Sequence, residues 1–304
     1  MSLLLTALLL AIIATALIGP ATITLRHAGW VSKAPRMAVL VWQSLGLSAA
    51  IAFIGSGLCV AVARFHVGFF GGIARLGAGL LDGHPLRGLG LPDALGLTLA
   101  ADLAIVLAFV ALATVWKTLR VRARHRLLVN LIARVNPGHP GTMLIEDPRA
   151  VAYCVPGIHP RIVVTTGALA ALSGEELAAV LDHERGHIHG RHGLVLLPMT
   201  RLWDLFRFIP YATLAPEAMR ELLEMAADDH AARRHNPAAL ASALLRLATP
   251  DTLPAAVFRA SGTGVPARIS RLIESPRTSR RTAWWAGAGA IALLATPVLL
   301  LTMT

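Results

Sequence analysis

The sequence predicts a mainly α-helical membrane protein with about four transmembrane helices and one α+β domain between the third and the fourth. Hydrophobic residues make up 55% of the 304 residues and the mean hydropathy is +0.63, well above the values of an ordinary soluble domain. The excess lies in four apolar blocks, each near the roughly 20 residues that a helix needs to cross a bilayer. Between the last two blocks, short β-branched runs precede amphipathic helical patterns, which is typical of an α+β domain.

The apolar blocks set the expected domain boundaries. The blocks 3–25, 37–63 and 283–304 contain no charged residue, and the only charges in 91–116 are Asp93 and Asp102. The first block has the length of a signal peptide, but a basic segment follows it rather than precedes it, which favours a retained span. We therefore expect a membrane domain over 1–119 with three spans (about 3–25, 37–63 and 91–116), a globular domain over 120–280 and a C-terminal span over 281–304.

The net charge of +11 is concentrated beside the expected spans. By the positive-inside rule, the first loop and residues 117–281 lie in the cytoplasm of a multi-pass protein of the cell membrane, and both termini lie outside. The loop 64–92 then lies outside although it carries three arginines. Basic residues at a membrane surface are explained by the lipid bilayer, so direct nucleic-acid binding is not expected. These basic residues are Arg26, Lys33 and Arg36, then Lys117, Arg120, Arg122, Arg124 and Arg126, and finally Arg268, Arg271, Arg277, Arg280 and Arg281.

Two cysteines and one aspartate need a separate interpretation. Cys59 lies in the second span and Cys154 in the globular domain, so no disulfide framework is expected, in agreement with a cytoplasmic domain. No histidine pattern around Cys154 marks it as a nucleophile, and we interpret it as a small buried residue. Asp102 lies inside the third span, where a charge is costly. It is either functional or close to the outer interface with Asp93, and the sequence leaves both interpretations open.

The first part of the globular domain predicts a small sheet. A basic helical stretch ends at the turn signal Asn136-Pro137-Gly138. Three apolar, β-branched runs follow at 143–146, 151–155 and 161–166, and Gly167 ends the last of them. About three short strands are therefore expected immediately before the helices of the domain.

Three helices are expected after the sheet. Ser173 and Glu176 have the spacing of a capping box, so a helix begins there and continues through residue 187. A proline begins a second helix over 217–235, with acidic residues early and arginines late, and 237–248 predicts a third. The apolar stretch 194–213 carries three charged residues, which favours an amphipathic or membrane-skimming segment over a fifth span.

The sequence His183-Glu184-Arg185-Gly186-His187 indicates a metal site on the first of these helices. Residues four apart lie on one face of a helix, so both imidazoles can reach the same ion. The glutamate beside the first histidine can act on a water molecule at the metal, which is the arrangement of a zinc peptidase. We therefore expect one Zn²⁺ per chain, with His183 and His187 as ligands and Glu184 as the general base.

A catalytic zinc site has three protein ligands, and the third must come from elsewhere in the chain. Metzincins would require a histidine at position 193, which is Gly193 here. His189 and His192 are therefore interpreted as polar residues at the end of the helix, where the helix dipole favours them.

Two carboxylates outside this helix are candidates for the third ligand. The aspartate of Leu81-Asp82-Gly83 precedes the histidines, whereas intramembrane site-two-type proteases have theirs after them, so we interpret this motif as a loop turn. Glu224 on the next long helix is the remaining candidate. Asp228 follows one turn later on the same face, where it can accept a hydrogen bond from a ligand histidine.

Taken in order, these features resemble the BlaR/MecR-type membrane zinc metallopeptidases, whose metal site is of the gluzincin kind. The resemblance rests on three spans, Val163-Val164-Thr165-Thr166-Gly167, Leu172-Ser173, His183-Glu184-x-x-His187, Glu224-x-x-Ala-Asp228, Arg268-Ile269-x-x-Leu272 and a last span. It covers essentially the whole chain. Asp182 and Arg185 depart from the family pattern, and they alter the charge near the site without removing a ligand. The sequence stops at Thr304, so we expect no β-lactam sensing through the extracellular penicillin-binding domain of the antibiotic sensors.

The resemblance implies a zincin-type metallopeptidase domain and a zinc metalloendopeptidase activity. Its substrate would be a protein, either a cytosolic transcriptional repressor or the chain itself, and an oligomer is compatible with the sequence. Tyr211, His230 and Arg233 are candidate donors to the oxyanion because they lie near or on the second helix. An extended substrate would pair with an edge such as 151–155.

Two alternative functions stay open. Quality-control peptidases of the HtpX and prenyl-protein endopeptidase group share both helical motifs, but they usually have two spans before the domain rather than three. A non-catalytic zinc-binding membrane signalling protein needs the ligands but not Glu184, and the presence of Glu184 favours an enzyme. The high content of Arg and Ala relative to Lys is typical of a bacterium with GC-rich coding.

Overall fold

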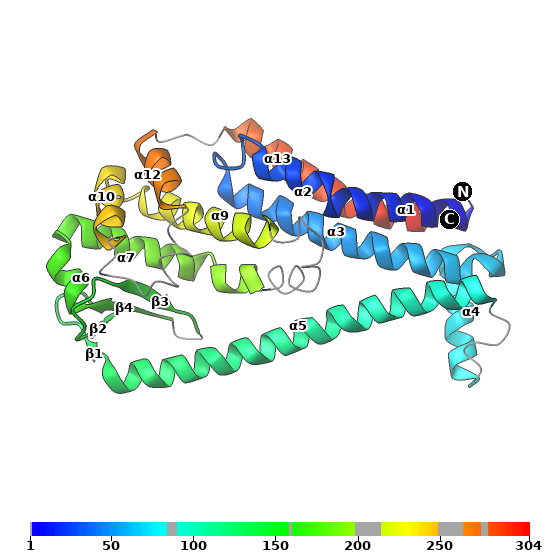
Figure 1. Cartoon of the computed structure of the whole chain (residues 1–304), viewed down its shortest axis with the longest axis horizontal. Helices are drawn as coiled ribbons and strands as arrows, with labels where there is room; N and C mark the ends of the chain where they lie inside the picture. Colours follow the sequence, from blue (N-terminus) through cyan, green and yellow to red (C-terminus); the bar gives the residue numbers. More distant parts are fainter. Residues whose placement is uncertain (1, 84–89, 158–159, 198–213, 249–263, 275–278) are drawn as a thin grey trace.

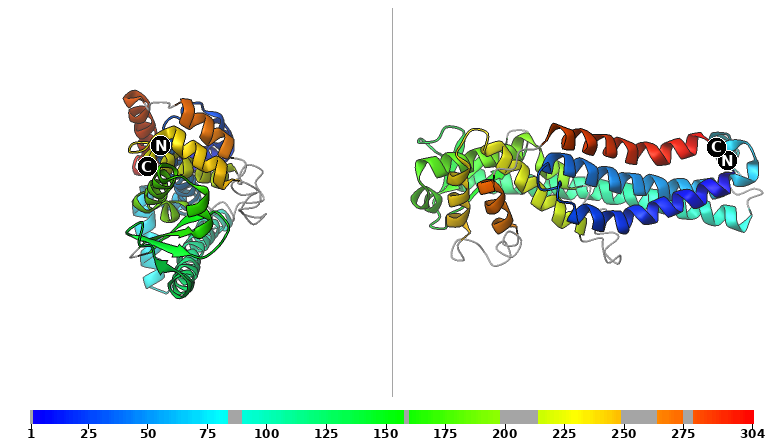
Figure 2. Two further views of the ribbon diagram at one scale, coloured as in Figure 1. Left: turned by 90° about the vertical axis from the view of Figure 1, so that its left-hand side faces the viewer. Right: turned by 90° about the horizontal axis from the view of Figure 1, so that it is seen from above.

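In the computed structural model, the chain is elongated, with a helical bundle at one end and a small α+β domain at the other (Figures 1 and 2). The structure describes residues 2–83, 90–157, 160–197, 214–248, 264–274 and 279–304. Helices predominate, and one small mixed sheet lies in the domain, which confirms the predicted fold class. Both termini lie at the end of the bundle that is remote from the domain (Figure 1).

Among the described residues, four helices are long and apolar enough to cross a membrane, as the sequence predicts. The first span, Leu3–His27, consists of α1 (Leu3–Ile18) and α2 (Pro20–His27), because Pro20 lacks an N–H and begins a new helix after Gly19. The second is α3 (Pro35–Val62), which continues into η1 (Ala63–Phe65), and the last is α13 (Arg280–Thr302). These three spans begin and end within two residues of their predicted bounds.

The third span belongs to α5 (Leu91–Ile132), a single helix that continues well beyond the predicted end of the span at residue 116. The basic residues after 116 mark the end of the apolar stretch, but the sequence from 117 to 132 contains neither Gly nor Pro to break a helix. The helix ends at Ile132, before the predicted turn at Asn136, because strand β1 (Arg134–Val135) begins there. The bundle and the sheet are therefore joined by one continuous helix (Figure 1).

Helix α3 is the centre of the bundle, and α1, α5 and α13 all pack against it. Its contact with α5 depends on two glycines. A Cβ atom on Gly57 would lie 2.7 Å from the carbonyl oxygen of Gly96, and a Cβ atom on Gly96 would lie 2.7 Å from the carbonyl oxygen of Gly57. Small residues of this kind allow the backbones of membrane helices to approach closely.

The expected outer loop 64–92 contains a helix, α4 (Gly68–Leu81), which is followed by a turn at Asp82 and Gly83 as predicted. The two aspartates of the third span lie in different surroundings. Asp93 caps α5 by accepting a hydrogen bond of 2.9 Å from the Gly90 N–H, and it lies 3.6 Å from Arg64. Asp102 is exposed on the surface of α5.

The sheet has four strands in the order β1-β2-β4-β3, where β2 is Thr142–Ile145, β3 is Ala152–Val155 and β4 is Arg161–Thr165. The three predicted strands are confirmed, and the two-residue strand β1 is too short to leave a sequence signal. Strands β2 and β4 run parallel, and β3 is antiparallel to β4 with Tyr153 opposite Val163. Strand β3 is an edge strand, as the substrate-pairing hypothesis requires.

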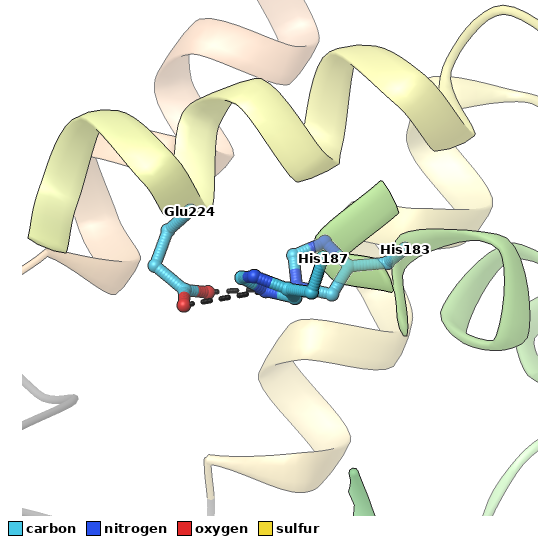
Figure 3. A group of neighbouring side chains, drawn as sticks. All are labelled: His183, His187 and Glu224. Atoms are coloured by element: carbon cyan, nitrogen blue, oxygen red, sulfur yellow. Dashed lines mark hydrogen bonds and ion pairs between the residues drawn. The ribbon is translucent and has the colours of Figure 1, made fainter. Parts of the chain in front are cut away.

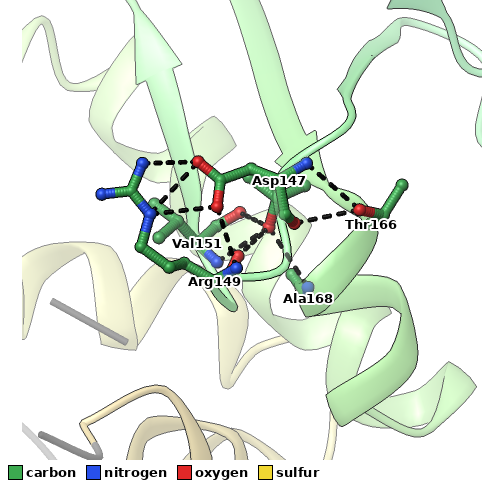
Figure 4. Close-up of polar contacts among 6 residues, drawn as sticks. Asp147, Arg149, Val151, Thr166 and Ala168 are labelled. Carbon is green, nitrogen blue, oxygen red and sulfur yellow. Dashed lines mark hydrogen bonds and ion pairs between the residues drawn. The ribbon is translucent and has the colours of Figure 1, made fainter. Parts of the chain in front are cut away.

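The connection from β2 to β3 is fastened to the start of α6 (Thr166–Ala171) (Figure 4). The Thr166 hydroxyl donates to the carbonyl oxygen of Asp147 at 2.9 Å and accepts from the Asp147 N–H at 3.2 Å. Gly167 lies inside α6 rather than ending the strand, and a glycine is needed there because a Cβ atom would collide with the carbonyl group of Pro148. These contacts fix the position at which β3 begins.

Four helices complete the described part of the domain: α7 (Gly174–His189), α9 (Leu214–Ala231), α10 (Pro237–Leu247) and α12 (Val265–Glu274). Buried residues of α7 such as Leu177 and Val180 pack against Val164 of β4 and Leu240 of α10. Helix α9 ends four residues before the predicted end at 235, so Arg233 lies in the turn after it rather than in its last turn.

Helix α9 also packs against the membrane helices. Its buried residues Met219 and Leu222 belong to the same hydrophobic cluster as Trp42 and Leu45 of α3. Of the stretch 194–213, the structure describes only 194–197, which is helical, so the predicted contact of this stretch with the membrane lies outside the described residues.

Candidate active site

Helix α7 presents His183 and His187 on one face. Its N-terminus is fixed by the predicted capping box, in which the Ser173 hydroxyl accepts from the Glu176 N–H at 3.3 Å and the Glu176 carboxylate accepts from the Ser173 N–H at 2.8 Å. Further along the helix, the Nε2 atoms of the two histidines lie 3.2 Å apart. The four-residue spacing therefore brings both nitrogens to one point, as the sequence predicts.

Helix α9 approaches α7 at Gly186 and brings Glu224 to the two histidines. A Cβ atom on Gly186 would lie 3.1 Å from the Cα atom of Ala227, so the glycine permits this close approach. The carboxylate oxygens of Glu224 lie 3.5 Å from Nε2 of His183 and 3.4 Å from Nε2 of His187 (Figure 3). The Glu224 side chain is 39% exposed, which leaves one side of the cluster open.

The spacing of these three residues fits a zinc ion. Zinc binds imidazole nitrogen and carboxylate oxygen at about 2.0–2.2 Å, so two ligand atoms of a tetrahedral site lie about 3.3–3.6 Å apart. The corresponding distances here are 3.2, 3.4 and 3.5 Å. Two imidazoles and one carboxylate also form a donor set that leaves a fourth position for water, as catalytic zinc sites require.

Asp228 lies one turn after Glu224 and contacts the first histidine. Its Oδ1 atom is 2.9 Å from Nδ1 of His183, although it lies off the direction of the ring N–H, so the contact is electrostatic rather than a well-directed hydrogen bond. Burial alone would lower the pKa of His183, but Asp228 and Glu224 outweigh it and raise this pKa to about 10. The same two carboxylates would stabilise the positive charge of a metal ion.

Arg268 of α12 holds both carboxylates of α9. Its guanidinium donates to the two oxygens of Asp228 at 2.8 and 2.7 Å and lies 3.0 Å from Oε2 of Glu224. Burial opposes the ionisation of Asp228, but the charge of Arg268 and its hydrogen bonds hold the pKa of Asp228 at about 2. Burial likewise opposes the ionisation of Glu224, yet the two histidines and Arg268 keep its pKa well below the ordinary value. The sequence indicated Arg268 only as part of a motif, and this contact was not predicted.

His192 contacts the second histidine. The Nδ1 atoms of His192 and His187 lie 2.8 Å apart, which is a hydrogen-bond distance, and His192 is only 8% exposed. Burial lowers the pKa of His192 to about 4, so its ring stays neutral and its Nδ1 atom can accept a hydrogen bond from the Nδ1–H of His187. His192 lies just after the end of α7, as interpreted from the sequence, but its burial and its contact with His187, which follow the left-handed residue Arg191 (φ 48°), were not predicted.

Glu184 lies between the metal-ligand cluster and the sheet. The backbone N–H of Cys154 in the edge strand β3 lies near its carboxylate and favours the ionised form. Burial raises the pKa of Glu184 above its ordinary value, although the nearby histidines oppose this rise. Burial also raises the pKa of the Cys154 thiol to about 12, and the thiol contacts Glu184. Cys154 is half-buried and protonated, which agrees with its predicted lack of a nucleophilic role, but its position beside Glu184 was not predicted.

The two unusual residues beside the first histidine neutralise each other. Arg185 lies 2.5 Å from Asp182, and the second oxygen of Asp182 lies 2.8 Å from Nε2 of His235. The charge of Arg185 is therefore paired within α7, and Asp182 also connects α7 to the turn after α9 through His235.

Of the three candidate donors to the oxyanion, the structure describes His230 and Arg233, and it does not bring these two together with the metal-ligand cluster. Tyr211 lies outside the described residues. His230 is buried, stacks on His189 and lies 3.1 Å from Arg233. Burial and the neighbouring arginines lower the pKa of His230. Among the contacts of the described residues, those of His230 and Arg233 connect the end of α9 to the end of α7 and do not include the three predicted ligands.

Comparisons with known proteins agree with this geometry. Residues 118–263 match the sequence profile of Peptidase family M48. A curated relative, "Protease HtpX homolog" of Thermoplasma volcanium, is 32% identical over 90 residues, which cover 29% of this chain and 29% of the relative. The match thus spans less than a third of the length of that relative. No solved structure matches the chain.

The fold, the His-His-Glu cluster and the M48 match together support the class of membrane metalloproteases. The matched region includes the sheet, α7 and α9, and hence all three predicted ligands. The narrower resemblance to the BlaR/MecR-type enzymes stays a prediction from the motifs and the order of the spans.

Proposed function

We propose that the chain is a multi-pass membrane zinc metalloendopeptidase with its peptidase domain on the cytoplasmic side and both termini outside. The observation that carries the proposal is the convergence of His183, His187 and Glu224 at tetrahedral spacing, with the half-buried Glu184 beside them. The match of residues 118–263 to Peptidase family M48 supports it.

Each residue of the site then has a role in peptide hydrolysis. Zinc held by His183, His187 and Glu224 would lower the pKa of a water molecule and polarise the scissile carbonyl group. Glu184 takes a proton from the attacking water and delivers it to the leaving amine. Its raised pKa suits this exchange, because a base whose pKa lies closer to the working pH both accepts and releases a proton readily.

The edge of β3 supports a mode of substrate binding. Strand β3 pairs with β4 on one side only, and the N–H of Cys154 lies near the carboxylate of Glu184. A substrate in extended conformation can add to this edge through backbone hydrogen bonds, which would place its carbonyl groups beside Glu184. This mode suits an unfolded segment of a protein better than a folded surface.

We further propose that the enzyme performs regulatory proteolysis of a cytosolic repressor or of itself. Three spans before the domain and one after it support this role, because that order is the one on which the BlaR/MecR resemblance rests. A quality-control role uses the same chemistry and is supported by the short match to the HtpX homologue. A zinc-binding protein without catalysis is less well supported, because it would not need a half-buried glutamate with a raised pKa beside the metal ligands.

The test compares protein N-termini in cells that express the wild type, Glu184→Gln or Glu175→Gln. Glu184→Gln removes the base but keeps the three proposed ligands. Glu175 is exposed in the first turn of the same helix and provides a matched control that should behave as the wild type.

A new N-terminus in one soluble regulator, present with the wild type and Glu175→Gln only, would support regulatory proteolysis and identify the substrate. Many such termini in membrane proteins would favour quality control. Identical termini for all three proteins, with and without cell-wall stress, would contradict a peptidase function.

A further inference from the structure

Helix α12 carries two buried arginines on adjacent turns, and both reach across to α9. Arg268 and Arg271 are each 8% exposed, although arginine is seldom buried unless its charge is paired. Leu272 of the same helix lies in the hydrophobic core of the domain together with Leu240 of α10. The helix is thus packed on one side and ion-paired on the other, beside α9 (Figure 1).

Arg268 fixes the relative orientation of the two functional carboxylates of α9. Two of its nitrogens bind both oxygens of Asp228, and a third lies 3.0 Å from Glu224. A guanidinium group is planar and presents its donors in a fixed fork, so it can hold two carboxylates at a set angle. A lysine ammonium group in the same place would supply the charge without this geometry.

Arg271 connects the same helix to the membrane bundle. Its guanidinium lies 2.7 Å from Asp229 of α9, and its Nε–H donates to the carbonyl oxygen of Ser32 at 2.6 Å. Ser32 belongs to the turn 28–34, which joins the first span to the second. The arginine therefore bridges α9, α12 and a turn that must move whenever these two spans move.

A second contact ties α9 to the first span. Arg26 in the last turn of α2 binds Glu221 through two hydrogen bonds of 2.7 and 3.0 Å. Glu221 lies one turn before Glu224 on α9. Because both side chains of this pair are about 30% exposed, its contribution is screened by solvent and is smaller than that of the buried arginines.

We propose that Arg268 and Arg271 are positioning residues that couple the turn between the first two spans to the metal ligand Glu224. This inference rests on the proposed metallopeptidase function and specifies its regulation. A shift of the first span relative to the second displaces Ser32, Arg271 transmits the displacement to α12, and Arg268 changes the orientation of Glu224 and Asp228. The spans thereby control how well the site holds its metal, without any contact to the substrate.

The test measures metal binding by the full-length protein in detergent, in the inactive Glu184→Gln background so that self-cleavage plays no part. Zinc affinity is obtained by competition with a chromophoric chelator, and the visible spectrum of bound Co²⁺ reports the geometry of the ligands. Arg268→Lys should weaken zinc binding by about 10- to 100-fold and alter the Co²⁺ spectrum. Arg271→Gln, which touches no ligand, should weaken zinc binding by roughly 2- to 30-fold.

Two further variants separate coupling from a loss of stability. Asp229→Asn breaks the ion pair between Arg271 and Asp229 from the side of α9. The double variant Asp229→Asn/Arg271→Gln should bind zinc no more weakly than Arg271→Gln alone, because both substitutions remove the same contact. Arg246→Gln removes an ion pair of α10 with Glu176, remote from the cluster, and should leave zinc affinity unchanged. Thermal unfolding shows whether each variant keeps its fold. If Arg271→Gln has lost its fold, the zinc affinities of Asp229→Asn and Arg271→Lys replace it as the test of coupling.

The outcomes distinguish this inference from the function on which it rests. If the parent protein binds no zinc, the proposed metallopeptidase function is wrong. If the parent binds zinc, but Arg271→Gln and Asp229→Asn keep its affinity and its Co²⁺ spectrum, the peptidase proposal stands and the coupling to the spans is overturned.

Discussion

Nδ1 of His192 lies 2.8 Å from Nδ1 of His187, the ring nitrogen that points away from the metal-ligand cluster. Each ligand histidine therefore has a partner on its outer nitrogen, since Asp228 occupies the equivalent place at His183. Such partners fix the tautomer and the ring orientation of a ligand histidine. The partner of His183 is the carboxylate of Asp228, and the partner of His187 is the imidazole of His192.

We predict that His192→Ala weakens zinc binding by about 10- to 100-fold, because the ring of His187 is then free to rotate and to change tautomer. His192→Asn should restore part of the affinity, since its side-chain oxygen can accept the same hydrogen bond. The measurement is the chelator competition described above. His189→Ala is the matched control, because His189 is exposed and its contacts, a hydrogen bond with the backbone oxygen of Arg185 and stacking on His230, do not include the predicted ligands. Equal affinities of the wild type and His192→Ala would contradict the assigned role.

The donor set predicts one zinc ion per chain. Glu224→Ala and His187→Ala should each abolish stoichiometric zinc, because a catalytic site with only two protein ligands holds the ion poorly. Glu184→Gln should retain it, since Glu184 lies beside the cluster rather than in it. Elemental analysis of protein purified in detergent measures the ratio. A full equivalent of zinc in Glu224→Ala would show that the third ligand lies elsewhere.

The stability of α7 should depend on pH through Glu176. The hydrogen bond from Ser242, assisted by the Ser173 N–H and Arg246, lowers the pKa of Glu176 below its ordinary value. A carboxylate whose pKa is lower in the folded state stabilises the fold above its unfolded pKa of about 4.3, and this contribution is lost as pH falls through the folded value.

Glu176→Gln should therefore lower the stability of the domain by roughly 1 kcal/mol at pH 7, on the scale of a helix cap. The difference from the wild type should shrink as the pH falls below about 4. Thermal unfolding between pH 7 and pH 3 measures both curves, with Glu175→Gln as the control that shows no such convergence. Parallel curves for the wild type and Glu176→Gln would contradict the prediction.

The contact of α3 with α5 should not tolerate a side chain at Gly96. Gly96→Leu would place its Cβ atom 2.7 Å from the carbonyl oxygen of Gly57, so the helices must separate, and overpacking of this kind costs about 1–3 kcal/mol. Gly289→Leu in the last span is the control, because no atom lies within 4 Å of a Cβ atom at that position. Unfolding of the two variants in detergent provides the comparison, and equal stabilities would show that the close contact is absent.

The parts of the structure that follow from local physics were predictable from the sequence. Apolar blocks of about 20 residues define spans because the bilayer has a fixed thickness. The capping box and the four-residue spacing of His183 and His187 are properties of a single helix. Glu224 was predictable for the same reason, because its spacing to Asp228 marks one face of the next helix.

Other features depend on contacts between distant segments and left no local signal. The sequence placed the end of the basic helical stretch at the turn signal Asn136-Pro137-Gly138, but α5 ends at Ile132, because the pairing of β1 with β2 is a contact between separate segments that no local pattern marks. Arg268 meets Asp228 across 40 residues of sequence, through the packing of α12 on the domain. His192 depends on one left-handed residue, which sequence periodicity does not reveal.

The ion pair between Arg26 and Glu221 also limits the distance between the end of the first span and the candidate metal site at Glu224. Arg26 lies in the last turn of the first span, and Glu221 precedes Glu224 by three residues, or about 4.5 Å along the axis of α9. In the proposed peptidase, the scissile bond would therefore be presented close to the headgroups. A substrate anchored in the same bilayer needs only a few extended residues, at about 3.3 Å each, to arrive there. A compact soluble substrate of the proposed peptidase would have to release a flexible segment first, so under this proposal the membrane surface would restrict which substrates reach the site.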